Sequence, residues 1–279
     1  MRTERGLGEN VRTALVYAVL IVIAVAMLIP FLWMLGTAFK SSSQVNAIPI
    51  IWLPWPLHFG NIVSAWTSVP FGRFFVNTFV VAIASTIGQI ITSVLAGYAF
   101  ARMRFRGKQV LFLLTLATLM IPFQVILIPT FLIIKHLGLV NTLWALILPN
   151  LATGFGVFLL RQFFLQIPTE MEEAATIDGA GRWRIMAQIM VPLARPAVAT
   201  LSVFTFLWAW NSYLWPLIVL NSPTKMTIQV GLSYFQGAHV GEYNVIMAGS
   251  FLSLIPIVIL FLITQRQLVA GIVAGAVKG

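Results

Sequence analysis

Residues 173–196 read Glu173-Ala-Ala-Thr-Ile-Asp-Gly-Ala180, then a basic run, then Ile189-Met-Val-Pro-Leu-Ala-Arg-Pro196. This stretch is polar, whereas the chain around it is not: 59% of the 279 residues are hydrophobic and 9% are charged. A soluble globular domain has about a quarter of its residues charged. The composition therefore predicts a polytopic membrane protein, in which this stretch is a cytoplasmic loop that docks on another protein.

Six apolar segments are long enough to cross a bilayer as helices, which takes about 20 residues each. They lie at 14–35, 74–100, 109–134, 143–164, 198–220 and 243–263. They predict an all-α membrane protein with six transmembrane helices, the first of which is too long for a signal peptide and is retained. The expected parts are an N-terminal segment with the first helix and an outer interfacial stretch (1–73), a five-helix core (74–264) containing the docking loop (165–196), and a C-terminal tail (265–279).

The net charge of +10 is explained by membrane topology. The basic residues lie in clusters at the ends of the apolar segments and form no groove-shaped stripe, which argues against nucleic-acid binding. A cytoplasmic N-terminus puts thirteen basic residues inside and four outside, in agreement with the positive-inside rule. The thirteen are Arg2, Arg5, Arg12, Arg102, Arg104, Arg106, Lys108, Arg161, Arg182, Arg184, Arg195, Arg266 and Lys278, and the four are Lys40, Arg73, Lys135 and Lys225. Both termini are predicted to be cytoplasmic, in a cell (inner) membrane.

The chain lacks the residues that would let it drive transport by itself. Ion-coupled carriers usually place charged residues inside their spans, at roughly 2.5 to 3.5 kcal/mol each, and the six spans carry essentially none. A phosphate-binding Gly-x-x-x-x-Gly-Lys-Ser/Thr loop is also missing from the sequence. With no cysteine, thiolate chemistry does not arise. An ion-coupled carrier is the disfavoured alternative, and the energy source is predicted to be another polypeptide.

The docking loop has the signals of two short helices. Thr169 can cap a helix whose third residue is Glu172, which predicts a capping box. This helix should run to about Ile177 and end at Asp178-Gly179, where glycine supplies a left-handed turn. A second, amphipathic helix is predicted from about residue 182 to just before Pro192, because proline interrupts helices.

Seven positions of this loop resemble the cytoplasmic signature loop of permease subunits in ATP-binding-cassette (ABC) importers. They are Glu173, Ala174, Ala175, Asp178, Gly179, Ile189 and Pro192. The resemblance implies the transmembrane domain of a type I ABC importer, whose docking helix enters a cleft of the ATPase, with Glu173 meeting a basic residue and Ala174 and Ala175 permitting close approach. It also implies a second homologous permease, an ATPase dimer that holds ATP and Mg, an extracytoplasmic sugar-binding protein and membrane lipids as partners. The chain itself is then expected to bind no cofactor or metal and to carry no catalytic residue.

Further motifs are similar to those of the second permease of maltose-type carbohydrate importers. They are Asn77-Thr78, Ala96-Gly-Tyr-Ala-Phe-Ala-Arg-Met-Arg-Phe105, Ile121-Pro122, Ile128-Pro129, Leu137-Gly-Leu-Val-Asn-Thr142, Trp210-Asn211, Gln265-Arg266 and the tail Gly275-Ala-Val-Lys-Gly279. This resemblance implies carbohydrate import. Which sugar is carried stays open, glycerol phosphate remains an alternative, and so does an amino-acid, metal or polyamine importer of the same superfamily.

Candidate substrate contacts lie in the fifth predicted span. Trp208, Asn211, Ser212 and Trp215 are spaced i, i+3, i+4 and i+7, which puts them on one face of a helix. Indole rings can cover the apolar faces of a sugar while amide and hydroxyl groups bind its hydroxyls. An interfacial aromatic belt and helix packing explain the same residues equally well. Gln124 is a further candidate, and Ser85, Gln89 and Ser93 are lesser ones.

Overall fold

The computed structural model describes residues 7–276, and all regular secondary structure in that range is helical. The chain divides into two compact units, Met1–Val69 with Tyr234–Leu254 and Pro70–Ser233 with Ile255–Gly279. Within this described range, three helices are long and apolar enough to cross a membrane, and up to six spans result if each of three bent helix pairs counts as one. The prediction of an all-helical membrane protein is confirmed.

The first unit contains α1 (Leu7–Ala38), α2 (Ser42–Val45), α3 (Gly60–Thr67) and the start of α15 (Tyr243–Ala276). Buried Asn61 connects them. Its Nδ2 donates to the carbonyl oxygens of Ala38 and Lys40 at 2.9 and 2.8 Å, and its Oδ1 accepts from Asn244 Nδ2 at 3.0 Å. One amide side chain therefore joins the ends of three helices. It supplies hydrogen bonds to carbonyl groups at the end of α1, where a helix has no backbone donors of its own.

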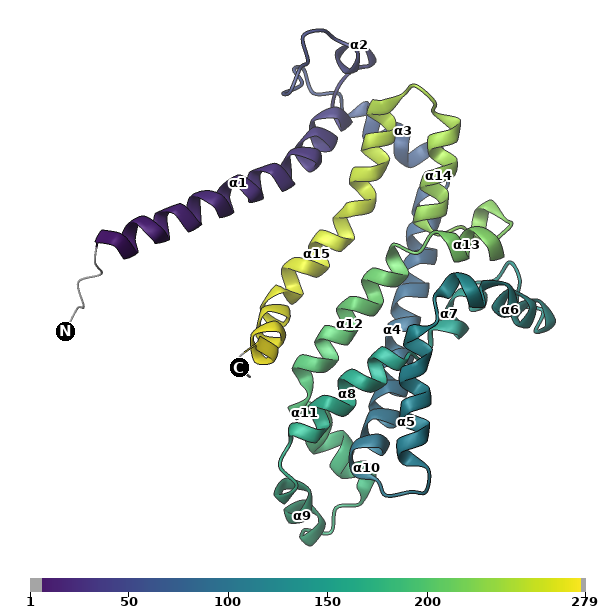
Figure 1. Ribbon diagram of the computed structural model, residues 1–279. Coiled ribbons are helices and arrows are strands. Elements are labelled where there is room, and N and C mark those ends of the chain that lie inside the picture. Colours follow the sequence, from purple (N-terminus) through teal and green to yellow (C-terminus); the bar gives the residue numbers. More distant parts are fainter. Residues whose placement is uncertain (1–6, 277–279) are drawn as a thin grey trace. The chain divides into compact units, whose positions relative to one another are not determined.

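The second unit is built on α4 (Phe71–Arg102), which packs against α8 (Gly154–Gln166) and α12 (Arg195–Trp210) (Figure 1). Small residues permit these contacts. A Cβ at Gly97 would lie 2.9 Å from Leu160 Cβ, and one at Gly156 would lie 2.1 Å from Ser93 Oγ. Close helix packing through small residues is typical of membrane helices, where apolar burial drives association less than in water.

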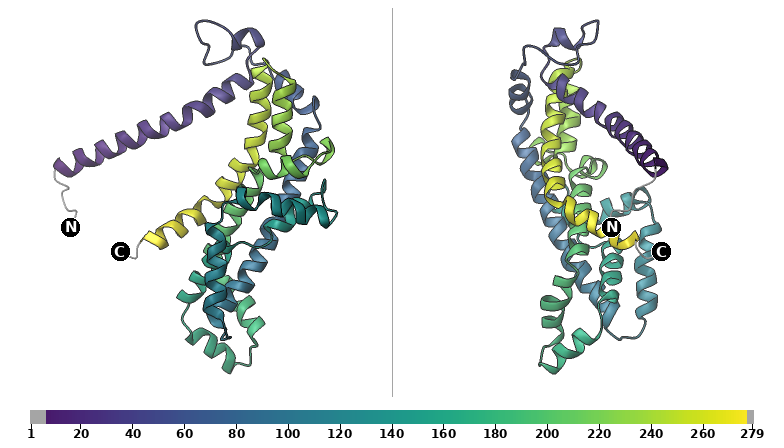
Figure 2. Two further views of the ribbon diagram at one scale, coloured as in Figure 1. Left: turned by 45° about the vertical axis from the view of Figure 1, so that its right-hand side comes forward. Right: turned by 90° about the vertical axis from the view of Figure 1, so that its left-hand side faces the viewer.

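The third predicted span, 109–134, is broken at Pro122. α5 (Lys108–Ala117) and the 3-10 turn η1 (Thr118–Met120) are followed by α6 (Phe123–His136) at an angle of 104° (Figure 2). Ile121 is extended, with ψ 114°, because the residue before a proline avoids the helical region. Pro122 therefore separates two helices rather than bending one.

The fourth span has a smaller break. α7 (Trp144–Ile147) and η2 (Leu148–Asn150) meet α8 at 41°. The fifth predicted span, 198–220, is also broken. α12 ends at Trp210 and α13 (Leu214–Val219) begins after a three-residue break. Pro216 explains the break, because its ring would clash with the carbonyl of Ser212 in a continuous helix.

The docking loop contains α9 (Glu170–Ile177), α10 (Arg182–Ile185), the π-helical turn η3 (Met186–Met190) and α11 (Val191–Leu193). The second helix was expected to stop before Pro192 but continues to Leu193. The π turn makes this possible: the N–H of Val191 bonds to Met186 O, five residues back. Pro192 then occupies the first turn of α11, where a missing N–H costs nothing.

The remaining elements, η4 (Pro223–Lys225) and α14 (Ile228–Ala238), follow α13. Asn77 and Thr78 on α4 hold this region. Asn77 Nδ2 donates to the carbonyls of Thr224 and Met226 at 3.0 Å each, and Thr78 Oγ1 accepts the N–H of Ile228 at 2.8 Å.

Beyond Gln265, the side chains of the glycine-rich tail lie outside the described residues, as do Arg2 and Arg5, so their predicted roles are untested.

Candidate functional site

The docking helix α9 ends as the sequence predicts. Gly179 has φ +81°, and the N–H of Ala180 bonds to Ala175 O at 2.9 Å across the turn. Most residues with a side chain are strained at this φ, so glycine is favoured here. Glu173, Ala174, Asp178 and Gly179 are exposed, whereas Ala175 is half-buried against the core of the second unit.

The predicted capping box is wrong. Thr169 has helical φ and ψ of −69° and −27° and makes no side-chain cap. The Glu172 carboxylate instead forms an ion pair with Arg102 at the end of α4. A guanidinium partner is stronger than a backbone N–H, and its position could not be known from the local sequence.

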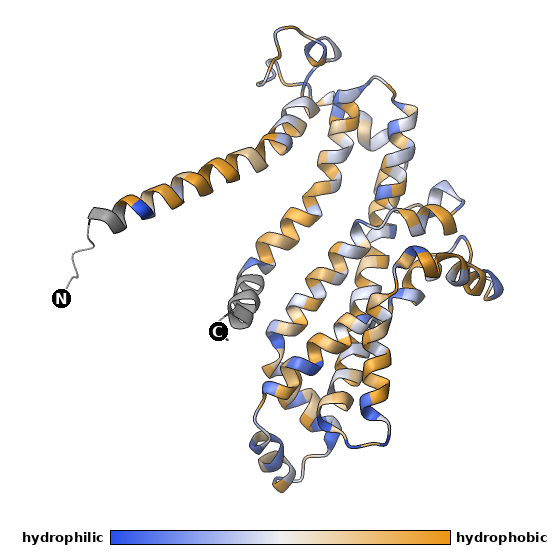
Figure 3. Cartoon of the chain, in the orientation of Figure 1, coloured by the Kyte–Doolittle hydropathy of each residue, from blue (hydrophilic) through white to orange (hydrophobic). Residues whose placement is uncertain are grey.

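The loop also exposes apolar side chains that the sequence analysis did not single out. Ile177 at the end of α9 is 87% exposed and Trp183 in α10 is 73% exposed. Hydrophilic residues are frequent in the docking loop at this end of the second unit (Figure 3). A large aromatic and an aliphatic side chain left in water beside exposed carboxylates are typical of a protein-binding surface.

A cavity of about 750 Å³ lies within the second unit, and all five predicted substrate-path residues line it. Its polar lining residues come from α4, α6, η2, α8, α12 and the break after α12. They are Gln89, Gln124, Asn150, Thr153, Thr205, Asn211 and Ser212, and the aromatic ones are Phe123, Phe155, Phe204, Trp208, Tyr213 and Trp215. Among these described lining residues none is charged.

The four candidates of the fifth span converge on this cavity, but not as one helical face. Trp208 is on α12 and is 51% exposed, whereas Trp215 is on α13 and is 3% exposed. The indole N–H of Trp215 donates to Ala145 O at 2.9 Å, and its ring meets Phe123 edge-on at 5.9 Å. Trp215 therefore forms part of the cavity wall, and its N–H is already hydrogen-bonded. Trp208 is an exposed aromatic lining residue that can contact a solute, as are Phe155, Phe204 and Tyr213.

Gln89 connects the three main helices of the second unit. It is buried on α4, donates from Nε2 to Thr153 Oγ1 and accepts at Oε1 from Thr205 Oγ1. Thr153 is the N-cap of α8, and its hydroxyl also accepts the N–H of Gly156 at 3.2 Å. Ser85 and Ser93 are buried and lie outside the lining of this cavity. Sequence analysis missed the two threonines because single hydroxyls in apolar spans have no distinctive spacing.

No group of three His, Cys, Asp or Glu side chains that could hold a metal ion occurs among the described residues.

Asn141, from the Leu137–Thr142 motif, has a conformational role. It has φ +62°, its N–H donates to Val219 O at 2.7 Å, and its Oδ1 accepts the N–H groups of Asn221 and Ser222 at 3.1 and 3.0 Å. This residue joins the loop after α6 to the loop after α13.

Comparison with known proteins gives a consistent family. The model of the binding-protein-dependent transport system inner membrane component matches residues 89–273. An arabinooligosaccharides transport system permease protein of Halalkalibacterium halodurans is 36% identical over 92% of this chain and 93% of its own length. An sn-glycerol-3-phosphate transport system permease protein of Yersinia pestis is 36% identical over 98% of both chains. A diacetylchitobiose uptake system permease protein of Streptomyces coelicolor is 31% identical over 95% of this chain and 89% of its own length.

Two solved structures have a similar fold. One is a bacterial ABC transporter involved in the import of the acidic polysaccharide alginate, with a TM-score of 0.84 and 24% identity over 94% of this chain and 98% of the other. The second is a bacterial alginate ABC transporter in complex with an alginate pentasaccharide-bound periplasmic protein, with a TM-score of 0.65 and 18% identity over 94% and 96% of the two chains.

Proposed function

This chain belongs to the binding-protein-dependent transport system inner membrane components, and we propose that it is the permease subunit of an ATP-driven importer for a neutral carbohydrate. One observation carries the choice of substrate: a cavity of about 750 Å³ whose described lining residues are aromatic, amide and hydroxyl side chains and two leucines, Leu207 and Leu214, without a charge. An ion-coupled carrier is set aside, because the spans hold no charged relay and the family depends on a binding protein.

The cavity favours a neutral sugar over glycerol phosphate, although relatives of both kinds exist. A phosphate group away from water needs cationic or multiple N–H partners, because burying an unpaired charge is strongly unfavourable. Sugar hydroxyls need amide and hydroxyl partners such as Asn211, Gln124 and Ser212, and the apolar face of the ring fits against an exposed indole such as Trp208. Whether the substrate has one sugar unit or several depends on the binding protein that delivers it.

The energy comes from a separate ATPase that docks on α9, while a second permease completes the path and a binding protein supplies the sugar. The exposed carboxylate of Glu173 beside Ala174 supports docking, as do the exposed Ile177 and Trp183. The sequence contains no phosphate-binding loop of its own, so ATP and Mg belong to the partner.

The substrate proposal is tested by uptake in cells that carry or lack this chain together with its partner subunits. Labelled arabinooligosaccharide, diacetylchitobiose and glycerol 3-phosphate are the probes. We expect loss of the chain to reduce uptake of a neutral saccharide and to leave glycerol 3-phosphate uptake unchanged. Chain-dependent uptake of glycerol 3-phosphate alone would contradict the proposal.

We further propose that both termini and the docking loop lie in the cytoplasm, on the evidence of thirteen inside against four outside basic residues. Reporter fusions at Ser43, Leu165 and Gly279 test this arrangement. A reporter active only outside the cytoplasm should respond at Ser43 and be silent at the other two positions. A response at Leu165 would put the docking loop on the wrong side for an ATPase and would refute the coupling argument.

A further inference from the structure

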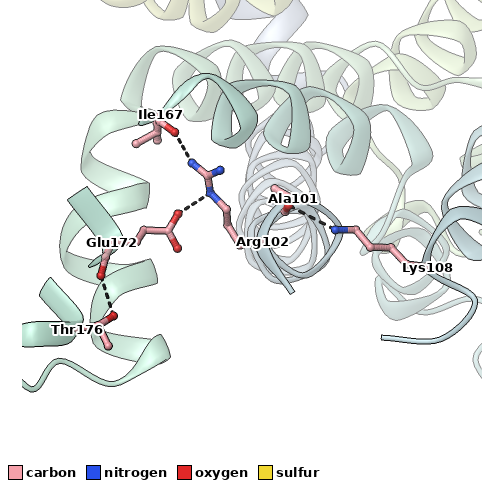
Figure 4. Close-up of polar contacts among 6 residues, drawn as sticks. All are labelled: Ala101, Arg102, Lys108, Ile167, Glu172 and Thr176. Carbon is pink, nitrogen blue, oxygen red and sulfur yellow. Dashed lines mark hydrogen bonds and ion pairs between the residues drawn. The ribbon is translucent and has the colours of Figure 1, made fainter. Parts of the chain in front are cut away.

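Arg102 connects the transmembrane helix α4 to the docking loop. It lies in the last turn of α4, and its guanidinium forms an ion pair with Glu172 of α9 and donates to the carbonyl oxygen of Ile167 (Figure 4). Ile167 is the residue that ends α8, and Glu172 is in the first turn of α9. One side chain therefore holds both sides of the three-residue connection between α8 and α9.

This ion pair is shielded from solvent, since the side chains of Arg102 and Glu172 are 11% and 15% exposed. The hydroxyl of Tyr98, one turn earlier on α4, interacts with the same carboxylate. Breaking a buried pair by removing one partner is strongly unfavourable, because the remaining charge is left without a partner. The pair therefore fixes the orientation of α9 far more firmly than a surface ion pair would.

Little else holds α9 in place. All eight residues of α9 are described, and none of them is fully buried. Ala175 contributes a half-buried contact with the core, and Gly179 turns the chain away. The link to Arg102 is accordingly the main polar attachment of the docking helix to the rest of the second unit.

The same α4 reaches the cavity. Gln89, which bonds to Thr153 and Thr205, precedes Arg102 by thirteen residues, or about 20 Å along a helix. Between these positions α4 is uninterrupted and packs along α8. A displacement of α9 that is transmitted to Arg102 therefore moves the uninterrupted helix α4, which also contacts residues of the cavity wall.

We propose that Arg102 is a positioning residue for coupling: it binds the docking helix to α4, so that a movement imposed on α9 by the ATPase is transmitted to the cavity. This inference rests on the proposed function, because it requires an ATPase at α9. It assigns a role to a residue that does not itself face the ATPase and that lies at the end of a transmembrane helix.

Two nearby cations provide matched controls. Lys108 Nζ donates to Ala101 O at 3.4 Å (Figure 4) and to Met103 O at 3.0 Å. It therefore binds carbonyl groups at the end of α4 and, within the described part of the chain, forms no hydrogen bond or ion pair with α9. Arg104 is exposed two residues beyond Arg102. Arg104→Glu changes the local charge by as much as Arg102→Glu, and Lys108→Met removes one positive charge; both leave the link between α4 and α9 intact.

The test uses the complete complex of this chain with its partner permease and ATPase, purified in detergent. Stimulation of ATP hydrolysis by the sugar-loaded binding protein is measured relative to basal hydrolysis for Arg102→Glu, Glu172→Arg and the double exchange. We expect each single change to lower the stimulation at least about 10-fold, and the double exchange, which restores opposite charges, to recover it to within about 3-fold. Arg104→Glu and Lys108→Met should retain the stimulation.

Arg102→Lys provides a second measurement that does not depend on the exchange. Lysine keeps the positive charge but lacks the planar guanidinium group, which binds the Glu172 carboxylate and the Ile167 carbonyl at the same time. The stimulation should therefore fall between that of the unmodified complex and that of Arg102→Glu. Stimulation that is unchanged in Arg102→Glu, or lost equally in the single and double variants, would overturn the inference. Glu173→Lys in the same preparation separates the two proposals: if it leaves the ATPase bound and stimulated, docking at α9 itself is refuted.

Discussion

Replacing Glu173 with lysine should abolish uptake, by more than about 100-fold, while the protein still accumulates in the membrane. The carboxylate is exposed on α9, and within the described part of the chain it has no ion-pair or hydrogen-bond partner. Removing this carboxylate should therefore change the stability of the fold little. A reversed charge that faces a basic group of the ATPase should weaken binding by several kcal/mol. Co-purification of the ATPase with the membrane subunit measures the loss.

Glu170→Lys is the matched control, because Glu170 is also an exposed carboxylate of α9 and lies three residues earlier. It should leave ATPase binding close to that of the unmodified complex. A companion change, Gly179→Pro, should also uncouple the complex, because proline cannot adopt the φ of +81° at this turn. Wild-type amounts of ATPase on Glu173→Lys would show that α9 is not the docking helix.

Trp208→Ala and Asn211→Ala should each weaken transport of the sugar by about 5-fold to 200-fold, which corresponds to about 1 to 3 kcal/mol for a lost ring contact or hydrogen-bond partner. Both side chains line the cavity and are exposed. The Oδ1 of Asn211 accepts only one long hydrogen bond, from Gln229 Nε2 at 3.5 Å. The half-saturation concentration for uptake is the measurement. Basal ATP hydrolysis should not change.

Trp215→Ala distinguishes a substrate contact from a packing residue. Trp215 is buried and bonded to Ala145 O, so its removal should lower the amount of assembled complex, by about 3 to 5 kcal/mol of stability. If Trp208→Ala behaves in this way as well, or leaves uptake unaltered, the exposed indole is a packing or lipid-facing residue and the sugar contacts lie on the partner permease.

The features that the sequence predicted correctly depend on neighbours along the chain. Long apolar segments must be membrane helices because backbone groups in lipid have to be satisfied internally. The helix Glu170–Ile177 and its turn at Gly179 follow from a polar run ended by a residue without a Cβ. The motif that contains Glu173 and the alanines beside it was enough to suggest the family that the comparison then gave, and its docking role stays a prediction.

Other details of the helices depend on a proline or on a distant partner. Pro122 and Pro216 turned two predicted spans into separate helices, because a missing N–H and a ring clash allow a break as readily as a bend. Thr169 does not cap α9, since Glu172 has a guanidinium partner 70 positions earlier in the chain. Hydrophobic length alone cannot distinguish these results.

The sequence by itself determined that this chain is a helical membrane protein with an exposed polar helix over residues 170–177, because composition, span length and turn chemistry are local properties. Only the tertiary structure decided that Trp208 and Trp215 share a cavity despite a broken helix, that Gln89 is bound by Thr153 and Thr205, and that Arg102 holds α9. The partners in each of these contacts come from different helices. Which helix supplies a partner depends on packing between helices, and a single helical period carries no information about that choice.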